Sequence, residues 1–200
     1  MPDDAAIDQP AIGHPLYIAW GRVVLHMSDQ GITAEANGLR FTRDGRITFR
    51  PYTDIVEINL AMNPVHKSAE MAQMTIRFFN GLTMRILNTT AWGNVDADQT
   101  QHYYRFKADL HERLIESGAA ANIAFTTGYT SGRGTFLKVA LAIGAIFFIG
   151  TPIVIFLMTG QAQALLVCVA GAGLILPFYR ASKRNEPGRY DPRSPPDMLA

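Results

Sequence analysis

Cysteine is almost absent from this sequence of 200 residues, in which Cys168 stands alone. A single thiol cannot form an intramolecular disulfide, which agrees with a reducing compartment. The sequence also has no marked excess of either charge, because it contains 18 Lys and Arg and 17 Asp and Glu. Without a clustered basic excess, the sequence does not predict nucleic-acid binding.

Patterns typical of catalytic and metal sites are missing as well. The glycine-rich stretch 128–134 (GYTSGRG) lacks the Lys-Ser/Thr pair that completes a phosphate-binding loop. No serine or cysteine has the setting of a nucleophile. The histidines show no metal-ligand spacing: His14, His26, His66, His102 and His111. We predict a protein that is not an enzyme and needs no cofactor and no metal, the alternative being a polar cluster assembled only in three dimensions.

The amino terminus lacks the features of a secretory signal. Residues 1–15 (MPDDAAIDQPAIGHP) begin with acidic side chains and contain no apolar segment. We expect a flexible lead-in here, with membrane targeting by a later part of the chain.

Two apolar runs within 136–179 are the dominant feature that is present. The first predicted span, about 137–158, is uncharged from Val139 onward and long enough to cross a bilayer core of about 30 Å. The second, about 162–179, is shorter and contains two glycines and Pro177. We predict a transmembrane hairpin of two helices, the alternative for the second run being a re-entrant or interfacial segment.

Charges around these runs predict their orientation. The connecting residues 159–161 are uncharged, whereas Arg133 and Lys138 precede the first run and five basic residues follow the second. Because Lys and Arg are enriched on the cytoplasmic side, we expect both termini in the cytoplasm of a multi-pass protein of the bacterial inner membrane. The segment 180–200 would form a basic, proline-rich tail.

Small residues in the runs predict close helix packing, either within the hairpin or between two copies of a homo-oligomer. They are Ala140, Gly144, Gly171 and Gly173.

Short apolar stretches that alternate with turn signals precede the membrane segment and are typical of antiparallel strands. Asp44-Gly45 and Asn80-Gly81 predict two-residue hairpins, since these dipeptides tolerate positive φ. We expect strands at about 23–27, 32–35, 39–43, 46–50, 54–61, 73–79 and 82–88. The predicted core is Phe41, Ile47, Phe49, Ile55, Ile58, Ile76, Phe78, Met84 and Ile86.

An amphipathic helix is predicted after these strands. Asp98 with Gln101 gives a capping-box start, and Gly118 gives a stop. Its apolar stripe is Tyr103, Phe106, Leu110 and Leu114. The domain would therefore cover 16–118, and a linker, 119–135, would join it to the first span, with a short strand at 123–126.

About seven short strands followed by one amphipathic helix resemble the pleckstrin-homology-like barrel of bacterial membrane-associated proteins. The resemblance also rests on 38–60 (GLRFTRDGRITFRPYTDIVEINL), with its Pro51-Tyr52-Thr53-Asp54-Ile55 step, and on the appended spans. It implies a mainly β fold with α, an antiparallel barrel closed by a C-terminal helix and followed by the hairpin. The tail 189–199 (RYDPRSPPDML) is similar to the ends of uncharacterised two-span bacterial membrane proteins, which brings no activity with it.

Four arginines bracket the Asp44-Gly45 turn: Arg40, Arg43, Arg46 and Arg50. Basic hairpin residues hold phospholipid headgroups in some members of the resembled superfamily, which implies phosphate binding by Arg43 and Arg46. The alternative is that the arginines occupy the solvated side of a half-buried hairpin.

Together these features predict a non-catalytic, membrane-anchored binding or scaffolding module on the cytoplasmic face. Its expected partners are membrane lipid and either another membrane protein or a second copy. The alternatives are an accessory subunit of a larger membrane enzyme or transporter, and a sensor of anionic lipid headgroups.

Overall fold

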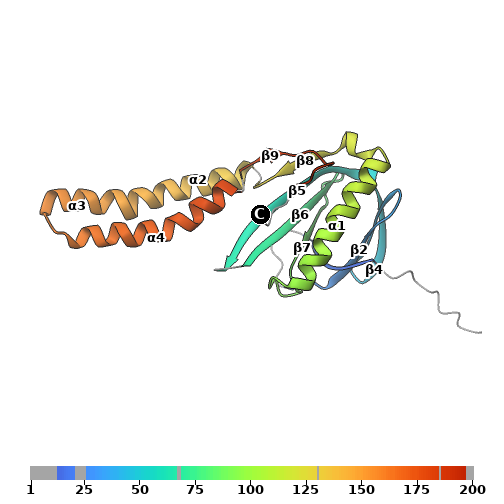
Figure 1. Cartoon of the computed structure of the whole chain (residues 1–200), viewed down its shortest axis with the longest axis horizontal. Helices are drawn as coiled ribbons and strands as arrows, with labels where there is room; N and C mark the ends of the chain where they lie inside the picture. The colour runs from blue at the N-terminus through green and yellow to red at the C-terminus, as the bar shows by residue number, and fades with distance from the viewer. Residues whose placement is uncertain (1–12, 21–25, 67–68, 130, 185, 197–200) are drawn as a thin grey trace, which may run out of the picture. The chain divides into compact units, whose positions relative to one another are not determined.

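The structure is a computed structural model that describes residues 13–20, 26–66, 69–129, 131–184 and 186–196 (Figure 1). Most of the predicted flexible segment 1–15 and most of the predicted strand 23–27 lie outside these residues. The predicted start of the domain, residue 16, falls within a first strand, His14–Trp20, that the sequence pattern did not reveal.

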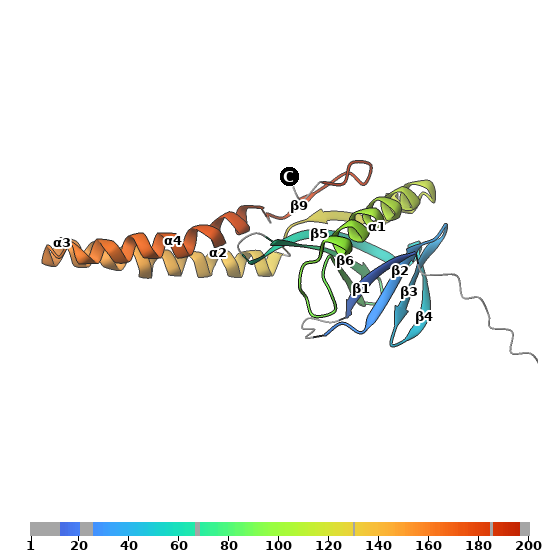
Figure 2. The same cartoon turned by 60° about the horizontal axis from the view of Figure 1, so that its bottom comes forward.

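Among the described residues, nine strands form one sheet in the order β4-β3-β2-β1-β7-β6-β5-β8-β9. Antiparallel pairing joins each of the first four to its neighbour, and β1 also pairs with β7. Figure 2 shows β2, β3 and β4 side by side. The bounds are β1 His14–Trp20, β2 Asp29–Ala34, β3 Gly38–Arg43, β4 Arg46–Pro51, β5 Ile55–His66, β6 Ala69–Phe78, β7 Thr83–Leu87, β8 Ala124–Thr127 and β9 Gly188–Arg189.

This order contradicts the predicted closed barrel. In the described part of the chain, β4 is one edge of the sheet and β9 is the other, so the sheet ends in two edges. The apolar stretch after the amphipathic helix explains the difference. It forms β8, which occupies the free side of β5, and β9 adds to it from the end of the chain.

The two predicted hairpin turns differ. Asp44 and Gly45 have φ values of 51° and 70°, as a two-residue type I′ turn requires, and β3 and β4 pair from Arg43 and Arg46 outward. The second turn has three residues, Phe79–Gly81, because the Phe78 N–H donates to the Leu82 carbonyl at 2.9 Å. Positive φ is recorded at Gly81 and not at Asn80, so the two-residue prediction there was wrong.

The helix α1 (Ala97–Glu116) packs on one face of β1, β2 and β7 (Figure 1). Its N-cap is Asp96, two residues before the predicted start, and the Asp96 carboxylate accepts a hydrogen bond from the Gln99 N–H at 3.0 Å. Gly118, at φ 72°, follows its end as expected. The predicted stripe Tyr103, Phe106, Leu110 and Leu114 is buried, which confirms the amphipathic helix but places it on a sheet face, not in a barrel mouth.

The core confirms most of the predicted residues: Phe41, Ile55, Ile58, Ile76, Phe78, Met84 and Ile86 are at most 3% exposed. The prediction was wrong for Ile47 and Phe49, which are 39% and 46% exposed. Both lie on the face of the β3/β4 hairpin opposite to Leu39 and Phe41, because side chains alternate along a strand.

Contacts divide the chain into two compact units. The first contains Met1–Ile58, Gln73–Ala124 and Pro192–Pro195, and the second contains Asn59–Ala72, Phe125–Asp191 and Pro196–Ala200. The first unit holds β1 to β4, β7 and α1. The second holds the long helices and the β8/β9 pair.

The second unit contains one continuous helical stretch: α2 (Ser131–Ala145), a π-helical turn η3 (Ile146–Gly150) and α3 (Thr151–Thr159). Pro152 accounts for the π turn, because proline has no N–H and its ring displaces the carbonyl four residues earlier. The Ile146 carbonyl accepts a hydrogen bond from the Thr151 N–H and a second from the Thr151 hydroxyl at 3.3 Å. After Gly160, α4 (Gln163–Arg184) packs against this stretch.

The predicted two-helix transmembrane hairpin was wrong. Among the described residues, one helix is long and apolar enough to cross a membrane, Val139–Thr159. The second predicted span, 162–179, lies in α4, which continues without a break into the basic residues up to Arg184. Several α4 side chains lie outside the described part of the structure.

The expected tail 180–200 returns to the sheet. β9 pairs with β8 through Thr126 opposite Arg189 and Thr127 opposite Gly188. Beyond the pair, the rings of Phe125 and Tyr190 pack edge to face with centroids 5.5 Å apart. Burial raises the pKa of Tyr190 above its usual range. The residues on both sides of the helices are therefore held in one sheet.

Candidate functional site

The β3/β4 hairpin carries the four arginines that the sequence singled out, and its register divides them. Residues directly opposite each other project from the same face. Arg43 lies opposite Arg46, and Leu39 lies opposite Arg50, so these three arginines share the face of the buried Leu39 and Phe41. Arg40 lies opposite Phe49 on the other face.

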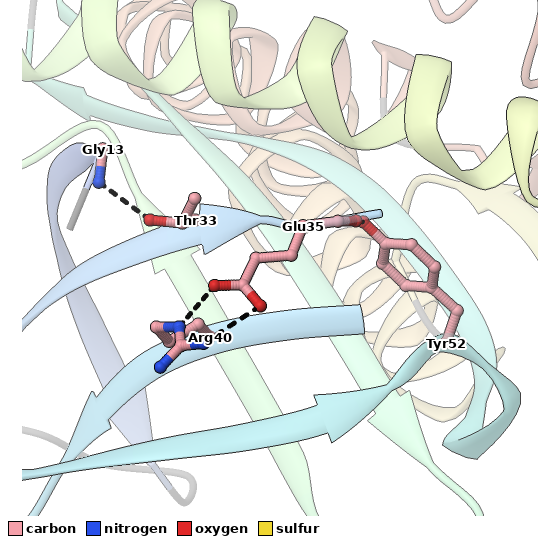
Figure 3. Close-up of polar contacts among 5 residues, drawn as sticks. All are labelled: Gly13, Thr33, Glu35, Arg40 and Tyr52. Atoms are coloured by element: carbon pink, nitrogen blue, oxygen red, sulfur yellow. Dashed lines mark hydrogen bonds and ion pairs between the residues drawn. The ribbon is translucent and has the colours of Figure 1, made fainter. Parts of the chain in front are cut away.

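Arg40 is occupied by a carboxylate. Its guanidinium makes two hydrogen bonds to Glu35, one from Nε to Oε1 and one from Nη2 to Oε2 at 3.3 Å (Figure 3). These bonds raise the pKa of Arg40 above its usual value. Because both acceptor oxygens are engaged, Arg40 fixes the turn between β2 and β3 and offers little to an added anion.

Tyr52 holds the same turn from the other side. Its hydroxyl donates to the Glu35 backbone carbonyl at 2.6 Å (Figure 3). Burial raises the pKa of Tyr52 to about 12. The charge of Arg113 lowers this pKa, and the charge of Glu35 raises it. The phenol therefore stays a donor at neutral pH, and the backbone at this end of the hairpin is fixed.

Arg43 lies over the Trp20 indole, with Cζ 5.0 Å from the ring centroid, and its Nε is 3.6 Å from the exposed Asp44 carboxylate. The indole is itself positioned, because Trp20 Nε1–H donates to Asp29 at 2.8 Å. Asp29 is 4% exposed and also accepts a hydrogen bond from the Gly45 N–H at 3.4 Å. Asp29 thus connects β1 and β2 to the β3/β4 turn.

Arg50 also has local partners. Its Nη1 lies 3.3 Å from Asp54 Oδ2, and its Cζ lies 6.0 Å from the centroid of the Phe78 ring. Arg46 differs from the other three arginines: it is exposed and has no acidic partner within 4 Å in the described part of the chain. Its directly opposed neighbour is Arg43, and like charges in that position repel.

The outer side of β4 is a free edge. The turn closes on the Arg43 and Arg46 pair, so alternate residues of β4 hydrogen-bond to β3 and the others point away. The N–H and C=O groups of Ile47 and Phe49 face this edge. No other described strand pairs with it. Pro51, which has no N–H, ends the strand.

No group of three or more His, Cys, Asp or Glu side chains with a metal-binding arrangement occurs among the residues that the structure describes. The predicted helix-packing residues lie in the second unit. A Cβ on Gly171 would lie 2.6 Å from the Phe148 Cβ, and one on Gly144 would lie 3.9 Å from the Ile175 side chain. A Cβ on Gly173 would meet nothing within 4 Å, and Ala140 is exposed.

Sequence reasoning missed the residues that position the arginines, namely Trp20, Asp29 and Glu35. Trp20 lay before the first expected strand, so its place beside the hairpin was not visible. Glu35 was assigned to a strand end, and the spacing of five residues to Arg40 is a signal that could have suggested their pairing across a tight turn.

No family model, curated protein or solved structure matches this chain.

Proposed function

We propose that this chain is a membrane-attached binding module, in which the helix Val139–Thr159 holds a β-sheet domain at the cytoplasmic face of a bacterial inner membrane. The observation that carries the proposal is the exposure of that helix. Ile146, Phe147, Leu157 and Met158 are each 67 to 81% exposed. Transfer of such a side chain from water to an apolar environment is worth about 1.5–3 kcal/mol.

The β8/β9 pair supports a common location for the two flanks of the helices. Because Thr127 and Gly188 are paired residues of one sheet, the residues that precede and follow the helices lie together. Basic residues in α2 and α4, including Lys138 and Arg180, favour the cytoplasmic side of the membrane for these flanks.

Binding is proposed as the role of the sheet domain because of the β4 edge and its exposed apolar side chains. A phospholipid headgroup is less well supported, since Arg40, Arg43 and Arg50 each lie within 4 Å of a carboxylate. We therefore propose that the sheet domain binds another protein, either as a scaffold or as an accessory subunit.

Membrane attachment is tested by expressing the full chain and washing the membrane fraction at alkaline pH, which releases peripheral proteins. The protein should stay in the pellet. Ile149→Lys places a charge in the middle of the helix at a cost of about 2.5–3.5 kcal/mol and should shift protein to the supernatant, whereas Ile149→Leu should not. Complete release of the wild-type chain would refute the attachment.

Purification in mild detergent with a tag after Ala200, followed by native mass spectrometry, tests the binding role. A protein that co-purifies in fixed stoichiometry supports it, and a multi-span enzyme or transporter in that position would specify an accessory subunit. If the chain purifies solely as a monomer with bound lipid, that result would contradict a protein-binding module.

A further inference from the structure

We infer that the free edge of β4 docks an extended segment of another protein in which acidic and apolar side chains alternate. The inference rests on the proposed binding role and specifies the chemistry of the partner. It combines three features of one short strand: unpaired backbone groups, an exposed apolar pair and an uncompensated positive charge.

The backbone provides the first feature. Ile47 and Phe49 direct two N–H and two C=O groups away from β3, and in the described residues no strand receives them. An added strand would satisfy these groups in register, which is the usual mode of peptide recognition at a sheet edge. Pro51 limits the length of the match to the strand before it, because proline has no N–H to donate.

The outer face provides the second feature. Ile47 and Phe49 are 39% and 46% exposed and lie two residues apart, so they project from the same face. Gly38 leaves room for the Phe49 ring, because a Cβ at Gly38 would lie 2.6 Å from the ring atom Cζ. A strand beside β4 would place every second side chain against this pair, and apolar side chains at those positions would gain the most.

The inner face provides the third feature. Arg46, Thr48 and Arg50 alternate with the apolar pair, and Arg46 faces Arg43 without an acid beside it. Carboxylates on the partner at the alternate positions would lie beside Arg46 and Arg50. Such charges would relieve the repulsion between Arg43 and Arg46 and would set the register of the added strand.

The same charges disfavour a second copy of this chain at the edge. Antiparallel pairing of two β4 strands about Thr48 would set Arg46 against Arg50 of the second copy on the same face. A lipid headgroup could use Arg46, but it has no groups that match the alternating N–H and C=O of the edge. An acidic and apolar extended segment uses all three features.

The test is a fluorescence-polarisation titration of the detergent-solubilised full chain with two labelled peptides of one composition. One alternates Glu and Val (EVEVEVE), and the other carries the same residues in blocks (EEEEVVV). Tighter binding of the alternating peptide by about tenfold or more is expected, because only its side chains match both faces of β4.

Two variants test the contacts. Ile47→Pro removes an outward N–H but keeps the bonds to β3, and it should weaken the alternating peptide about tenfold, whereas Ile47→Val should leave it within about threefold. Arg46→Glu should weaken it by a similar factor and strengthen an alternating Lys and Val peptide, which a misfolded variant could not do. Arg105→Glu, on the exposed side of α1, is the matched charge control and should change neither.

Equal binding of the alternating and block peptides would overturn the inference. So would binding that Arg46→Glu does not alter, a dimer that Ile47→Pro dissolves, or Arg46-dependent binding to anionic vesicles without peptide binding. Alkaline washing of membranes from the same cells reports attachment independently, so loss of peptide binding alone rejects the edge site and not the membrane module.

Discussion

Gly38→Ala should destabilise the sheet domain, because Gly38 lies opposite Pro51 in the β3/β4 hairpin, at a position with no room for a side chain. A Cβ there would lie 2.8 Å from the Pro51 Cα and 2.6 Å from the Phe49 ring, and it would also overlap the Arg50 carbonyl oxygen. Two of these three atoms belong to the backbone, so no rotamer change removes the overlap. Overpacking of this kind costs about 1–3 kcal/mol.

Thermal unfolding of the full chain in detergent, followed by tryptophan fluorescence, measures this cost. Trp20 reports on the hairpin, since its ring centroid lies 5.4 Å from that of Phe41. For a domain of about 100 residues, 1 kcal/mol corresponds to about 4–8 °C in Tm, so a decrease of roughly 5 to 20 °C is expected.

Gly13→Ala is the matched control for this change. The nearest atom to a Cβ on Gly13 is the Thr33 hydroxyl oxygen at 3.6 Å, an ordinary contact. Its effect should stay within about 0.5 kcal/mol. If the Gly38 and Gly13 variants unfold at the same temperature, the lack of room for a side chain at Gly38 would be refuted, and with it the close approach of the Phe49 ring.

Three further changes test other parts of the structure. Asp29→Ala leaves the Trp20 indole N–H without its acceptor and should lower the free energy of unfolding by about 1–3 kcal/mol, seen as an earlier urea midpoint; an unchanged midpoint would contradict the bond. Burial lowers the pKa of His111 below its usual 6.5, so the unfolded chain binds more protons than the folded one in the window below 6.5. Stability should therefore fall as the pH decreases through that window, and His111→Gln should reduce the dependence measured between about pH 7 and 5; identical pH profiles would argue against a buried neutral ring. Gly171→Val should loosen the packing of α4 on the π turn and lower the Tm in detergent, while Gly173→Val should not, because only the first position lacks room for a Cβ; equal Tm values for the two would reject that contact.

The local elements of the first unit could be predicted from the sequence because their signals are local. Asp44-Gly45 specifies the β3/β4 turn through two positive φ values, and the apolar stripe from Tyr103 to Leu114 specifies the buried face of α1. The strand β1 was missed because its apolar alternation begins directly after the proline-rich start of the chain.

The open sheet could not be predicted from the sequence, since whether a sheet closes depends on which strand occupies each edge. A short strand was expected at 123–126 in a linker. The observed strand is Ala124–Thr127, and nothing in these residues indicated that it would pair with β9. The exposure of Ile47 and Phe49 was missed for a related reason. Alternation shows that two sets of side chains occupy opposite faces, but here both sets include apolar residues, so the pattern alone does not say which face is buried.

The sequence placed the four arginines on the β3/β4 hairpin, where they lie, but it did not reveal the contacts that each of them makes. The four arginines were found from their spacing around the turn. Glu35 and Asp54 lie within five residues of Arg40 and Arg50, whereas Trp20 comes from β1 and reaches Arg43 only through folding. Only the structure shows that Arg46, unlike the other three arginines, has no acidic partner within 4 Å among the described residues.

The β8/β9 pair can also be regarded as a hairpin whose loop is the entire helical segment. About 60 residues separate Thr127 from Gly188, and closing a loop of that length costs about 2–3 kcal/mol more than closing a turn of a few residues. Two paired positions cannot offset this cost alone, so the packing of Tyr190 on Phe125 must contribute to holding β8 and β9 together. The pairing of β8 and β9 therefore does not require the helical segment. A short Asn-Gly turn in its place should leave the two strands paired, with a lower entropic cost of closing the loop than in the natural chain.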